Sequence, residues 1–452
     1  MAAPTTIFRG TFFHTPAYGQ LDALRDTLVV VQDGKIARIA PGSEEAAVMR
    51  EFGLQQVRQL QARMAMEGQY FVPGFIDTHV HAPQYKFTGT GTDVPLMDWL
   101  EKYTFPSECS FRDLEAAQHR YSLLVKRFLA NGTTTAMYYG SLHLAPNTVL
   151  VDTIEALGQR AVVGKVNMDR HSPEDYMEST ADGLRDAEEF LKYTLAKKSS
   201  RIMPCITPRF IPTCTPELMK VAHALSLGLK VGLGTDVAGG ISPSMLTAQR
   251  MAVVNSRCLR AHKLAVAGGT RVTPEMETDV ITFKEALWLA TMGGAQALDL
   301  ADRIGSFEVG KEFDALLVDT AMGGTSGPFD VFADEDDLNH FEKFINLGDD
   351  RNLVEVYVQG VCVKRGSAFL LDPTSAVPTP ADEMRLMRAP TPAEPEAAPL
   401  DLAHESSDGS MAAARDGEGA NAETADEADT AAREAQAETE PESTPRTKRS
   451  RR

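Results

Sequence analysis

Between residues 74 and 236, short runs rich in β-branched residues alternate with stretches of helical length. The strand-like runs lie at 74–78, 133–139, 161–167, 201–208 and 228–235. Alternation of this kind is typical of βα units, in which parallel strands form a sheet or barrel and helices cover it. Functional side chains of such barrels lie at the carboxyl ends of the strands. The pattern predicts an α/β fold with a parallel barrel.

Two further groups of strand-like residues flank this central region. The first occupies residues 6–72 and the second residues 310–364. Both are rich in β-branched and aromatic residues, which favour strands. We expect the two groups to form one small β-sandwich domain, made of residues 1–72 and 305–372. The barrel-type domain would then comprise residues 73–304.

The chain changes character after residue 372. From residue 373 onward Ala, Pro, Glu, Ser and Thr dominate and large apolar residues are scarce, a composition typical of disorder. The segment 373–452 is acidic overall but ends in a basic cluster, 446–452. This segment could serve as a nuclear-import signal or bind an acidic partner. The simpler interpretation is that it is a solvent-exposed chain end without a specific function.

Composition narrows the classes of partner. The net charge of −18 argues against nucleic acid as a main ligand. Five cysteines without a CxxC motif fit a reducing compartment. The sequence has no apolar run of transmembrane length and no apolar signal-peptide core at its start. We therefore expect a cytoplasmic protein that binds neither membranes nor nucleic acid.

The first central strand ends in the motif Asp77-Thr-His-Val-His81. Residues two apart on a strand point to the same face, so His79 and His81 project together. Two imidazoles at a strand end suit a metal ion of borderline softness. A half-exposed strand that happens to carry two histidines is the simpler interpretation of this motif by itself, and the flanking residues decide against it.

Several longer motifs accompany the two histidines. They are PGFIDTHVHAPQY (73–85), PLMDWLEKYTFPSE (95–108), ITPRF (206–210), VGLGTD (231–236) and ISPSML (241–246). Together these residues resemble the guanine deaminases of the amidohydrolase superfamily, in a match that extends to about residue 370. The resemblance implies a TIM-like barrel of the metal-dependent hydrolases. It also implies zinc-dependent hydrolysis of guanine to xanthine and ammonia, a step of purine catabolism.

The resemblance assigns metal ligands. His79, His81 and Asp236 would hold the zinc ion, and Asp236 would also accept a proton from the attacking water. A bound zinc ion lowers the pKa of its water to about 7, so hydroxide is available at neutral pH. Considered alone, an aspartate in the context of Asp236 is more often a turn residue or a helix N-cap.

The resemblance also assigns residues to guanine binding. Gln84 can donate and accept hydrogen bonds at a purine edge, and Arg209 offers a rigid fork to paired acceptors. Phe210 would stack on the base, or else pack the barrel rim. Trp99 and Tyr103 lie in an amphipathic stretch and are expected to form a lid or to pack the core.

One part of the family pattern is missing. In the family, two more zinc-binding histidines and a proton-shuttling glutamate lie between the residues that match Arg209 and Asp236. Only 26 residues (235 − 210 + 1) lie there in this chain, and their sole histidine, His223, has the apolar neighbours of a packed helix. Because a βα unit needs about 30 residues, about three units are predicted to be absent between Phe210 and Gly228. The barrel is therefore predicted to be incomplete.

Two hypotheses follow from the missing part. In the first, the chain is a zinc-dependent guanine aminohydrolase with a shortened sequence. In the second, it is a non-catalytic relative that acts as a binding or dimer partner. A homodimer is a further expectation, because relatives tend to dimerise.

Overall fold

The computed structural model describes residues 5–53, 63–65, 68–209, 213–214, 230–269, 272–273, 280–321 and 327–372. Three predictions fall on residues outside these ranges: the tail from residue 373, the substrate-binding residue Phe210, and His223, which was expected to pack in a helix and not to bind metal. None of the described helices is both long enough and apolar enough to cross a membrane.

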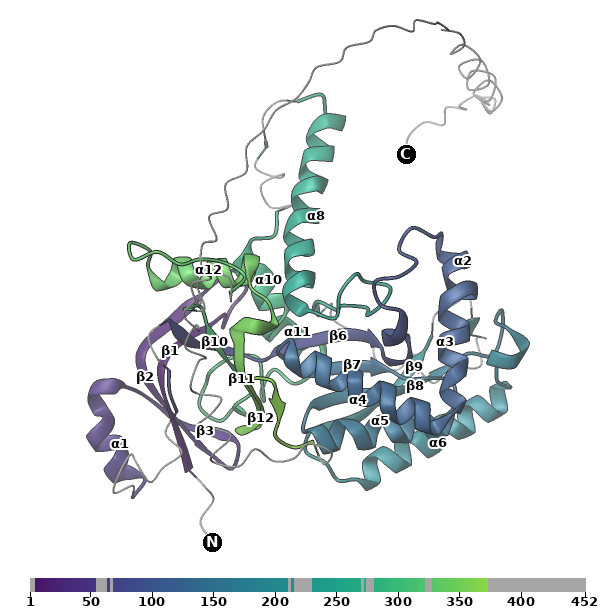
Figure 1. The fold of residues 1–452 in the computed structure, drawn as a ribbon, viewed down its shortest axis with the longest axis horizontal. Helices are drawn as coiled ribbons and strands as arrows, with labels where there is room; N and C mark the ends of the chain where they lie inside the picture. Colours follow the sequence, from purple (N-terminus) through teal and green to yellow (C-terminus); the bar gives the residue numbers. More distant parts are fainter. Residues whose placement is uncertain are drawn as a thin grey trace, which may run out of the picture. The chain divides into compact units, whose positions relative to one another are not determined.

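The larger sheet takes strands from both ends of the chain (Figure 1). Its nine strands follow the order β13-β12-β11-β10-β5-β1-β2-β3, with β4 paired to β1. These strands are β1 (Thr5–His14), β2 (Asp22–Gln32), β3 (Lys35–Pro41), β4 (Arg63–Met64), β5 (Gln69–Pro73), β10 (Ala315–Asp319), β11 (Leu353–Val358), β12 (Val361–Arg365) and β13 (Ala368–Phe369). The two ends meet where β5 and β10 pair antiparallel. The strand groups thus combine as predicted, whereas a sandwich of two packed sheets is not shown by the described residues and stays a prediction, as do the domain boundaries.

Aromatic side chains hold the two ends together. Phe8 of β1 stacks on Phe313, just before β10, with ring centroids 4.2 Å apart. Phe12 of β1 stacks on Phe71 of β5 at 4.7 Å. All four rings are fully buried. Burial of such a ring contributes about 1.5–3 kcal/mol, so this cluster is a main source of cohesion for the sheet.

The second sheet is parallel and carries the candidate site. Its strands are β6 (Phe75–His81), β7 (Thr133–Tyr139), β8 (Arg160–Asn167) and β9 (Ile202–Pro208), in that order. The helices α4 (Leu114–Ala130), α5 (Leu144–Leu157) and α6 (Thr180–Ala196) pack against it, as Figure 1 shows. Four of the five predicted central strands are therefore confirmed.

Local sequence explains where these helices begin and which face they bury. The carboxylate of Asp113 accepts hydrogen bonds from the first backbone N–H groups of α4, and the hydroxyl of Ser179 does the same for α6. On α4, Tyr121, Leu124 and Phe128 are buried at spacings of three and four residues. This spacing places them on one helical face, toward the strands.

The fifth predicted strand, residues 228–235, is not a regular strand where it is described. Residues 230–236 lie along β6, where Thr78 N donates to Leu233 O at 3.0 Å and Asp236 N donates to His79 O at 2.9 Å. The N–H of Leu233 bonds instead to the carbonyl of Leu289, at the end of a helix. Because that donor is used outside the sheet, no continuous ladder forms, and the prediction of a strand here was wrong in this respect.

Within the described residues, the parallel strands and segment 230–236 form an open arc. No described strand pairs with the outer edge of β9. Apolar side chains are exposed on both sides of this opening: Ile206 of β9 is 38% exposed and Val231 is 57% exposed. The structure therefore has the α/β content of the predicted barrel, and closure of that barrel is not shown.

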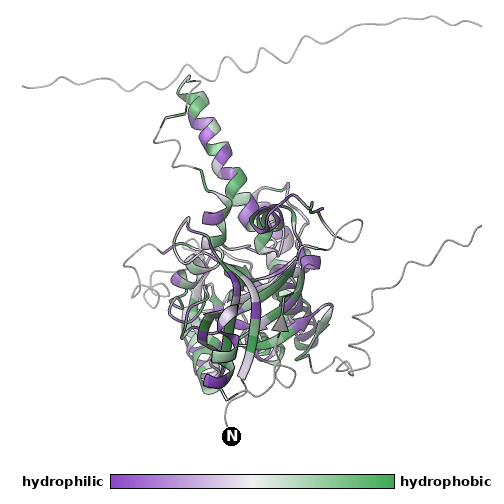
Figure 2. Cartoon of the chain, turned by 90° about the vertical axis from the view of Figure 1, so that its left-hand side faces the viewer, coloured by the Kyte–Doolittle hydropathy of each residue, from purple (hydrophilic) through white to green (hydrophobic). Residues whose placement is uncertain are grey.

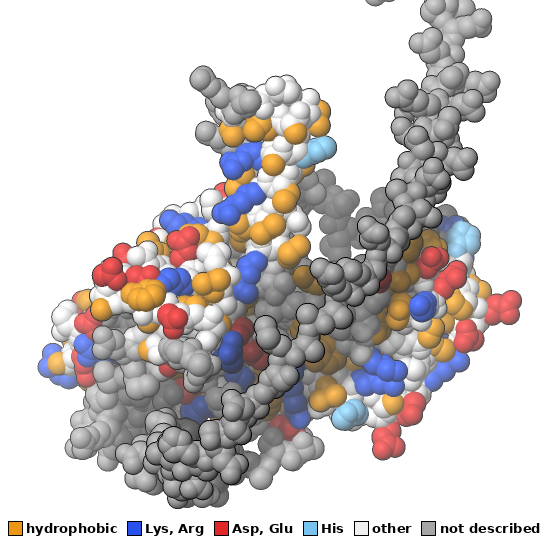
Figure 3. Space-filling model, turned by 45° about the horizontal axis from the view of Figure 1, so that its top comes forward, with side chains coloured by type: hydrophobic (Ala, Val, Ile, Leu, Met, Phe, Trp, Pro, Cys, Tyr) orange, Lys and Arg blue, Asp and Glu red, His pale blue; other side chains and the backbone are white. Residues whose placement is uncertain are grey.

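The long helix α8 (Met245–Val266) extends away from the sheets (Figures 1 and 2). Met251, Val254 and Leu259 are exposed on it, and Figure 3 shows apolar side chains beside Lys and Arg side chains on its surface. The shorter helices are α1 (Glu45–Glu51), α2 (Leu96–Trp99), α3 (Phe105–Cys109), α10 (Phe283–Leu289), α11 (Met292–Ala297) and α12 (Asp337–Leu347).

Candidate metal centre and substrate site

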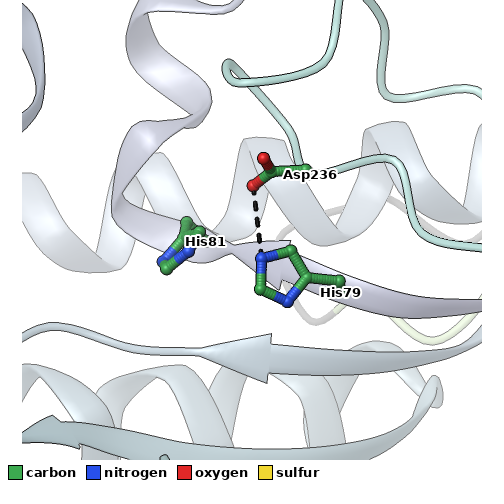
Figure 4. Close-up of side chains that lie close together, drawn as sticks. All are labelled: His79, His81 and Asp236. Atoms are coloured by element: carbon green, nitrogen blue, oxygen red, sulfur yellow. Dashed lines mark ion pairs between the residues drawn. The ribbon is translucent and has the colours of Figure 1, made fainter. Parts of the chain in front are cut away.

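Three side chains with metal-ligating atoms converge at the carboxyl end of β6. One ligand atom from each of His79, His81 and Asp236 lies within 4.8 Å of the others. Nε2 of His79 is 3.4 Å from Oδ1 of Asp236, the contact that Figure 4 marks. Both histidine rings also contact the ring of Tyr139, at the carboxyl end of β7, with centroids 4.7 and 5.0 Å away. The three residues that the sequence predicted as metal ligands therefore lie together.

A buried carboxylate fixes Asp236 relative to β6. Oδ1 of Asp77 accepts hydrogen bonds from the backbone N–H of His79 (3.1 Å) and of Thr235 (3.0 Å), and Oδ2 accepts from the hydroxyl of Thr235 (2.5 Å). Glycine allows the close approach: a Cβ on Gly234 would lie 2.7 Å from the Cβ of His79. Asp236 itself has a φ of 45°, in the left-handed region that aspartate tolerates better than most residues. This turn presents the carboxylate to the two imidazoles.

The electrostatic surroundings favour the forms that bind a metal ion. Burial lowers the pKa of His81, and the charges of Arg209 and His79 lower it further, so the ring is neutral. Burial raises the pKa of Asp236, but the hydrogen bond from His79 and the positive charge of Arg209 help to outweigh it, and the net pKa is lowered. Nδ1 of His81 is buried without a hydrogen-bond partner among the described residues. Neutral imidazole and ionised carboxylate are the states that coordinate metals.

Two of the three predicted substrate residues meet at one carboxylate. Nε2 of Gln84 donates to Oε1 of Glu108 at 2.9 Å, and Nη1 of Arg209 donates to Oε2 at 2.6 Å. The hydroxyl of Tyr176 donates to the same Oε2 at 2.9 Å. The guanidinium of Arg209 also lies over the ring of Phe105, 5.5 Å from its centroid. The structure therefore joins Gln84 and Arg209, while the third predicted residue, Phe210, lies outside the described residues.

Sequence reasoning missed Asp77 and Glu108 as organisers of the site. Both stand within the motifs that carry the family resemblance, and both are fully buried, which is rare for carboxylates without partners. Trp99 and Tyr103 contact Phe87, with ring centroids 5.5 and 6.1 Å away. These contacts support the packing interpretation of the two aromatic residues.

The comparison with protein families agrees with the motifs. The profile of the amidohydrolase family matches residues 70–224 and 216–363. The guanine deaminase of Rattus norvegicus is 35% identical over 450 positions, which cover 78% of this chain and 95% of that protein. The chain belongs to the guanine deaminase family. The predicted resemblance is thereby confirmed, and the hypothesis of a non-catalytic relative finds no support in these matches.

A second guanine deaminase shows how much shorter this chain is than its relatives. The protein of Dictyostelium discoideum is 32% identical over 454 positions, covering 79% of this chain and 98% of that protein. Because 79% of 452 residues is about 357 (0.79 × 452), about 97 of these positions hold no residue of this chain. The two stretches of the family match meet at residues 216–224. This difference in length is consistent with the predicted absence of about three βα units.

A solved guanine deaminase shares the fold. The crystal structure of the guanine deaminase from C. acetobutylicum, with bound guanine in its active site, aligns with a TM-score of 0.66 at 26% identity. The alignment covers 79% of this chain and 99% of that chain. The chain therefore shares the fold of the amidohydrolase superfamily with this guanine deaminase.

Proposed function

We propose that this chain is a zinc-dependent guanine deaminase, which hydrolyses guanine to xanthine and ammonia. The convergence of His79, His81 and Asp236 at the carboxyl end of β6 carries the proposal. The names of the curated relatives and the guanine bound to the C. acetobutylicum enzyme support the choice of substrate. Catalytic residues of barrels occupy this position on the strands.

The donor set fits zinc. Two imidazole nitrogens and one carboxylate oxygen are ligands that zinc accepts in catalytic sites, which commonly use three protein ligands. Two ligands at about 2.1 Å from one tetrahedral ion lie about 3.4 Å apart, and Nε2 of His79 and Oδ1 of Asp236 are separated by 3.4 Å. We infer that these two residues and His81 hold the ion. When bound, zinc supplies a polarised water at neutral pH.

The other residues of the site bind the purine and move a proton. Arg209 and Gln84 hold the edge of guanine, and Phe210 stacks on its face, as the family motif implies. The water oxygen adds to the ring carbon that carries the exocyclic amine, while the carboxylate of Asp236 accepts a proton from that water. One of the two water protons is placed on the adjacent ring nitrogen, and the other, held by Asp236, passes to the exocyclic amine. The bond from carbon to that nitrogen then breaks, and the nitrogen leaves as ammonia.

We further infer a cytoplasmic homodimer with a barrel that lacks about three βα units. All five cysteines are free thiols, which fits a reducing compartment. The shortened alignments support the loss of the units. Among the described residues, no fourth His, Cys, Asp or Glu joins the cluster of three ligands.

Zinc content and turnover test the proposal together. The purified full chain is loaded with zinc and desalted, its metal content is measured, and xanthine formation from guanine is followed by absorbance. We expect one zinc ion per chain and formation of xanthine. Asp236→Asn removes one of three ligands and should lower the zinc affinity at least about tenfold. Asp33→Asn is the matched control, because Asp33 also has a positive φ (50°) but lies in the turn between β2 and β3.

Two outcomes contradict the proposal. Absence of both zinc binding and xanthine formation by the unmodified chain would refute it as a whole. Equal zinc affinity of the Asp236→Asn and Asp33→Asn variants would refute the assignment of Asp236 as a ligand.

A further inference from the structure

Glu108 lies at the centre of a buried hydrogen-bond network beside the candidate metal centre. Its side chain is 0% exposed, and both carboxylate oxygens are used. Oε1 accepts from Gln84, while Oε2 accepts from Arg209 and from Tyr176. The charge of Arg209 acts on His81 and Asp236, so the network adjoins two of the three proposed ligands.

The network determines which atom of Gln84 faces the site. A carboxylate only accepts hydrogen bonds, so the amide group of Gln84 must present its nitrogen to Glu108. Its oxygen is then directed elsewhere. Gln84 is 2% exposed, and its Oε1 is buried with no hydrogen-bond partner among the described residues. A buried acceptor without a donor is unfavourable, and a bound ligand with an N–H group would satisfy it.

The same carboxylate restrains Arg209. One N–H of its guanidinium bonds to Glu108, and the plane of the group is supported by Phe105. An arginine held at two points loses little freedom when it binds, and it offers its N–H groups in a fixed geometry. The site therefore combines a fixed acceptor on Gln84 with fixed donors on Arg209.

We propose that Glu108 is a positioning residue that sets substrate specificity: it fixes Gln84 as a hydrogen-bond acceptor and Arg209 as a donor. The site then selects a purine whose edge places an N–H group next to a carbonyl or ring-nitrogen acceptor. Guanine has such an edge, in which the N1–H lies beside the 6-carbonyl. This inference rests on the proposed function, because it refines how the same site recognises a purine.

Binding of hypoxanthine and its methylated forms tests this inference without turnover. Hypoxanthine keeps the N1–H and the 6-carbonyl but has no exocyclic amine to release. 1-Methylhypoxanthine lacks the N1–H, and 9-methylhypoxanthine keeps it. Dissociation constants for the zinc-loaded chain are measured by equilibrium dialysis. We expect the unmodified chain to bind 1-methylhypoxanthine about 10- to 100-fold more weakly than 9-methylhypoxanthine, because the oxygen of Gln84 stays unpaired.

The Glu108→Gln variant should lose this discrimination. A glutamine at position 108 can donate as well as accept, so the amide of Gln84 is free to turn. We expect the ratio of the two dissociation constants to fall at least fivefold. Glu355→Gln is the matched control: Glu355 is also 0% exposed and also bonds a tyrosine and an arginine, Tyr357 and Arg365, but it lies on β11 in the other sheet. Its ratio should equal that of the unmodified chain.

A double variant shows whether Glu108 acts through Gln84. Gln84→Met removes the acceptor, so it should itself abolish the discrimination, and adding Glu108→Gln to it should change the ratio no further. Gln84→Met tests the acceptor by itself: whether or not Glu108→Gln folds, unchanged discrimination in the Gln84→Met variant would overturn the inference. Unchanged discrimination in a folded Glu108→Gln variant would overturn it as well. If the unmodified chain binds none of the three purines, the proposed function falls together with this inference.

Discussion

Replacing Asp77 with leucine is expected to destabilise the fold and to disturb the metal centre at the same time. Asp77 is completely buried and joins β6 to the turn that carries Asp236, through the N–H groups of His79 and Thr235. Leucine has a similar size but no acceptor. The substitution therefore leaves two buried backbone donors without partners and releases the turn from β6.

The size of the effect follows from these two donors. Each buried N–H that loses its acceptor costs about 1–3 kcal/mol, so Asp77→Leu should lower the free energy of unfolding by about 2–6 kcal/mol. The entropy of unfolding is about 2.1 cal/mol/K per residue, which for ~370 folded residues makes 1 kcal/mol equivalent to about 1.3 °C. The midpoint of thermal unfolding should fall by about 3–8 °C. Asp77→Asn keeps an amide oxygen that accepts from both donors, so its midpoint of thermal unfolding should fall much less.

The ionisation of Asp77 adds a dependence on pH. Burial raises the pKa of Asp77 from 3.8 to about 6. Between these two values the folded chain keeps a proton that the unfolded chain has lost, so this group makes the fold less stable as the pH rises through that window. The loss amounts to up to about 3 kcal/mol, at 1.36 kcal/mol per pKa unit. Asparagine does not titrate, so the stability of Asp77→Asn relative to the unmodified chain should increase from pH 4 to pH 7.

Urea unfolding of the metal-free proteins between pH 4 and 8, followed by circular dichroism, measures both effects, and zinc content is measured in parallel. The reasoning is refuted if Asp77→Leu is as stable as Asp77→Asn at pH 7. It is also refuted if the difference between Asp77→Asn and the unmodified chain is the same at pH 4 and at pH 7.

Three further predictions concern the rest of the molecule. Arg160 is fully buried and pairs with two buried carboxylates, Asp314 (2.9 and 3.1 Å) and Glu312 (2.5 Å). Arg160→Met should therefore cost about 3–5 kcal/mol in urea unfolding, and adding Asp314→Leu should restore only part of that loss, because Glu312 stays buried without Arg160. Burial lowers the pKa of Lys364 from 10.5 to about 8, so this group makes the fold more stable as the pH rises from about 8 to 10.5. Lys364→Met should therefore be about 1–3 kcal/mol more stable than the unmodified chain at pH 7 and should lose this advantage at pH 10.5. A variant that is less stable at pH 7 would contradict the argument. Free zinc at 100 times its dissociation constant should raise the free energy of unfolding by about 2.7 kcal/mol, and the same zinc concentration should do so far less in Asp236→Asn, as differential scanning calorimetry can show.

The sequence by itself determined the elements that depend on local interactions. The strands at 133–139 and 201–208 could be predicted because runs of β-branched residues bounded by turns favour the strand conformation. His79 and His81 could be assigned to one face because the side chains of a strand alternate with a period of two. The motifs around them were sufficient to indicate the family.

Only the tertiary structure decided which distant residues meet. Asp236 lies beside His79 because segment 230–236 runs along β6, with Gly234 allowing the close approach. Glu108 joins Gln84 and Arg209, which are 24 and 101 positions away from it in the sequence. Such contacts depend on the order of strands and on the packing of helices against them. The side chains that organise the site are therefore specified by the whole fold, whereas its ligands could be recognised from short motifs.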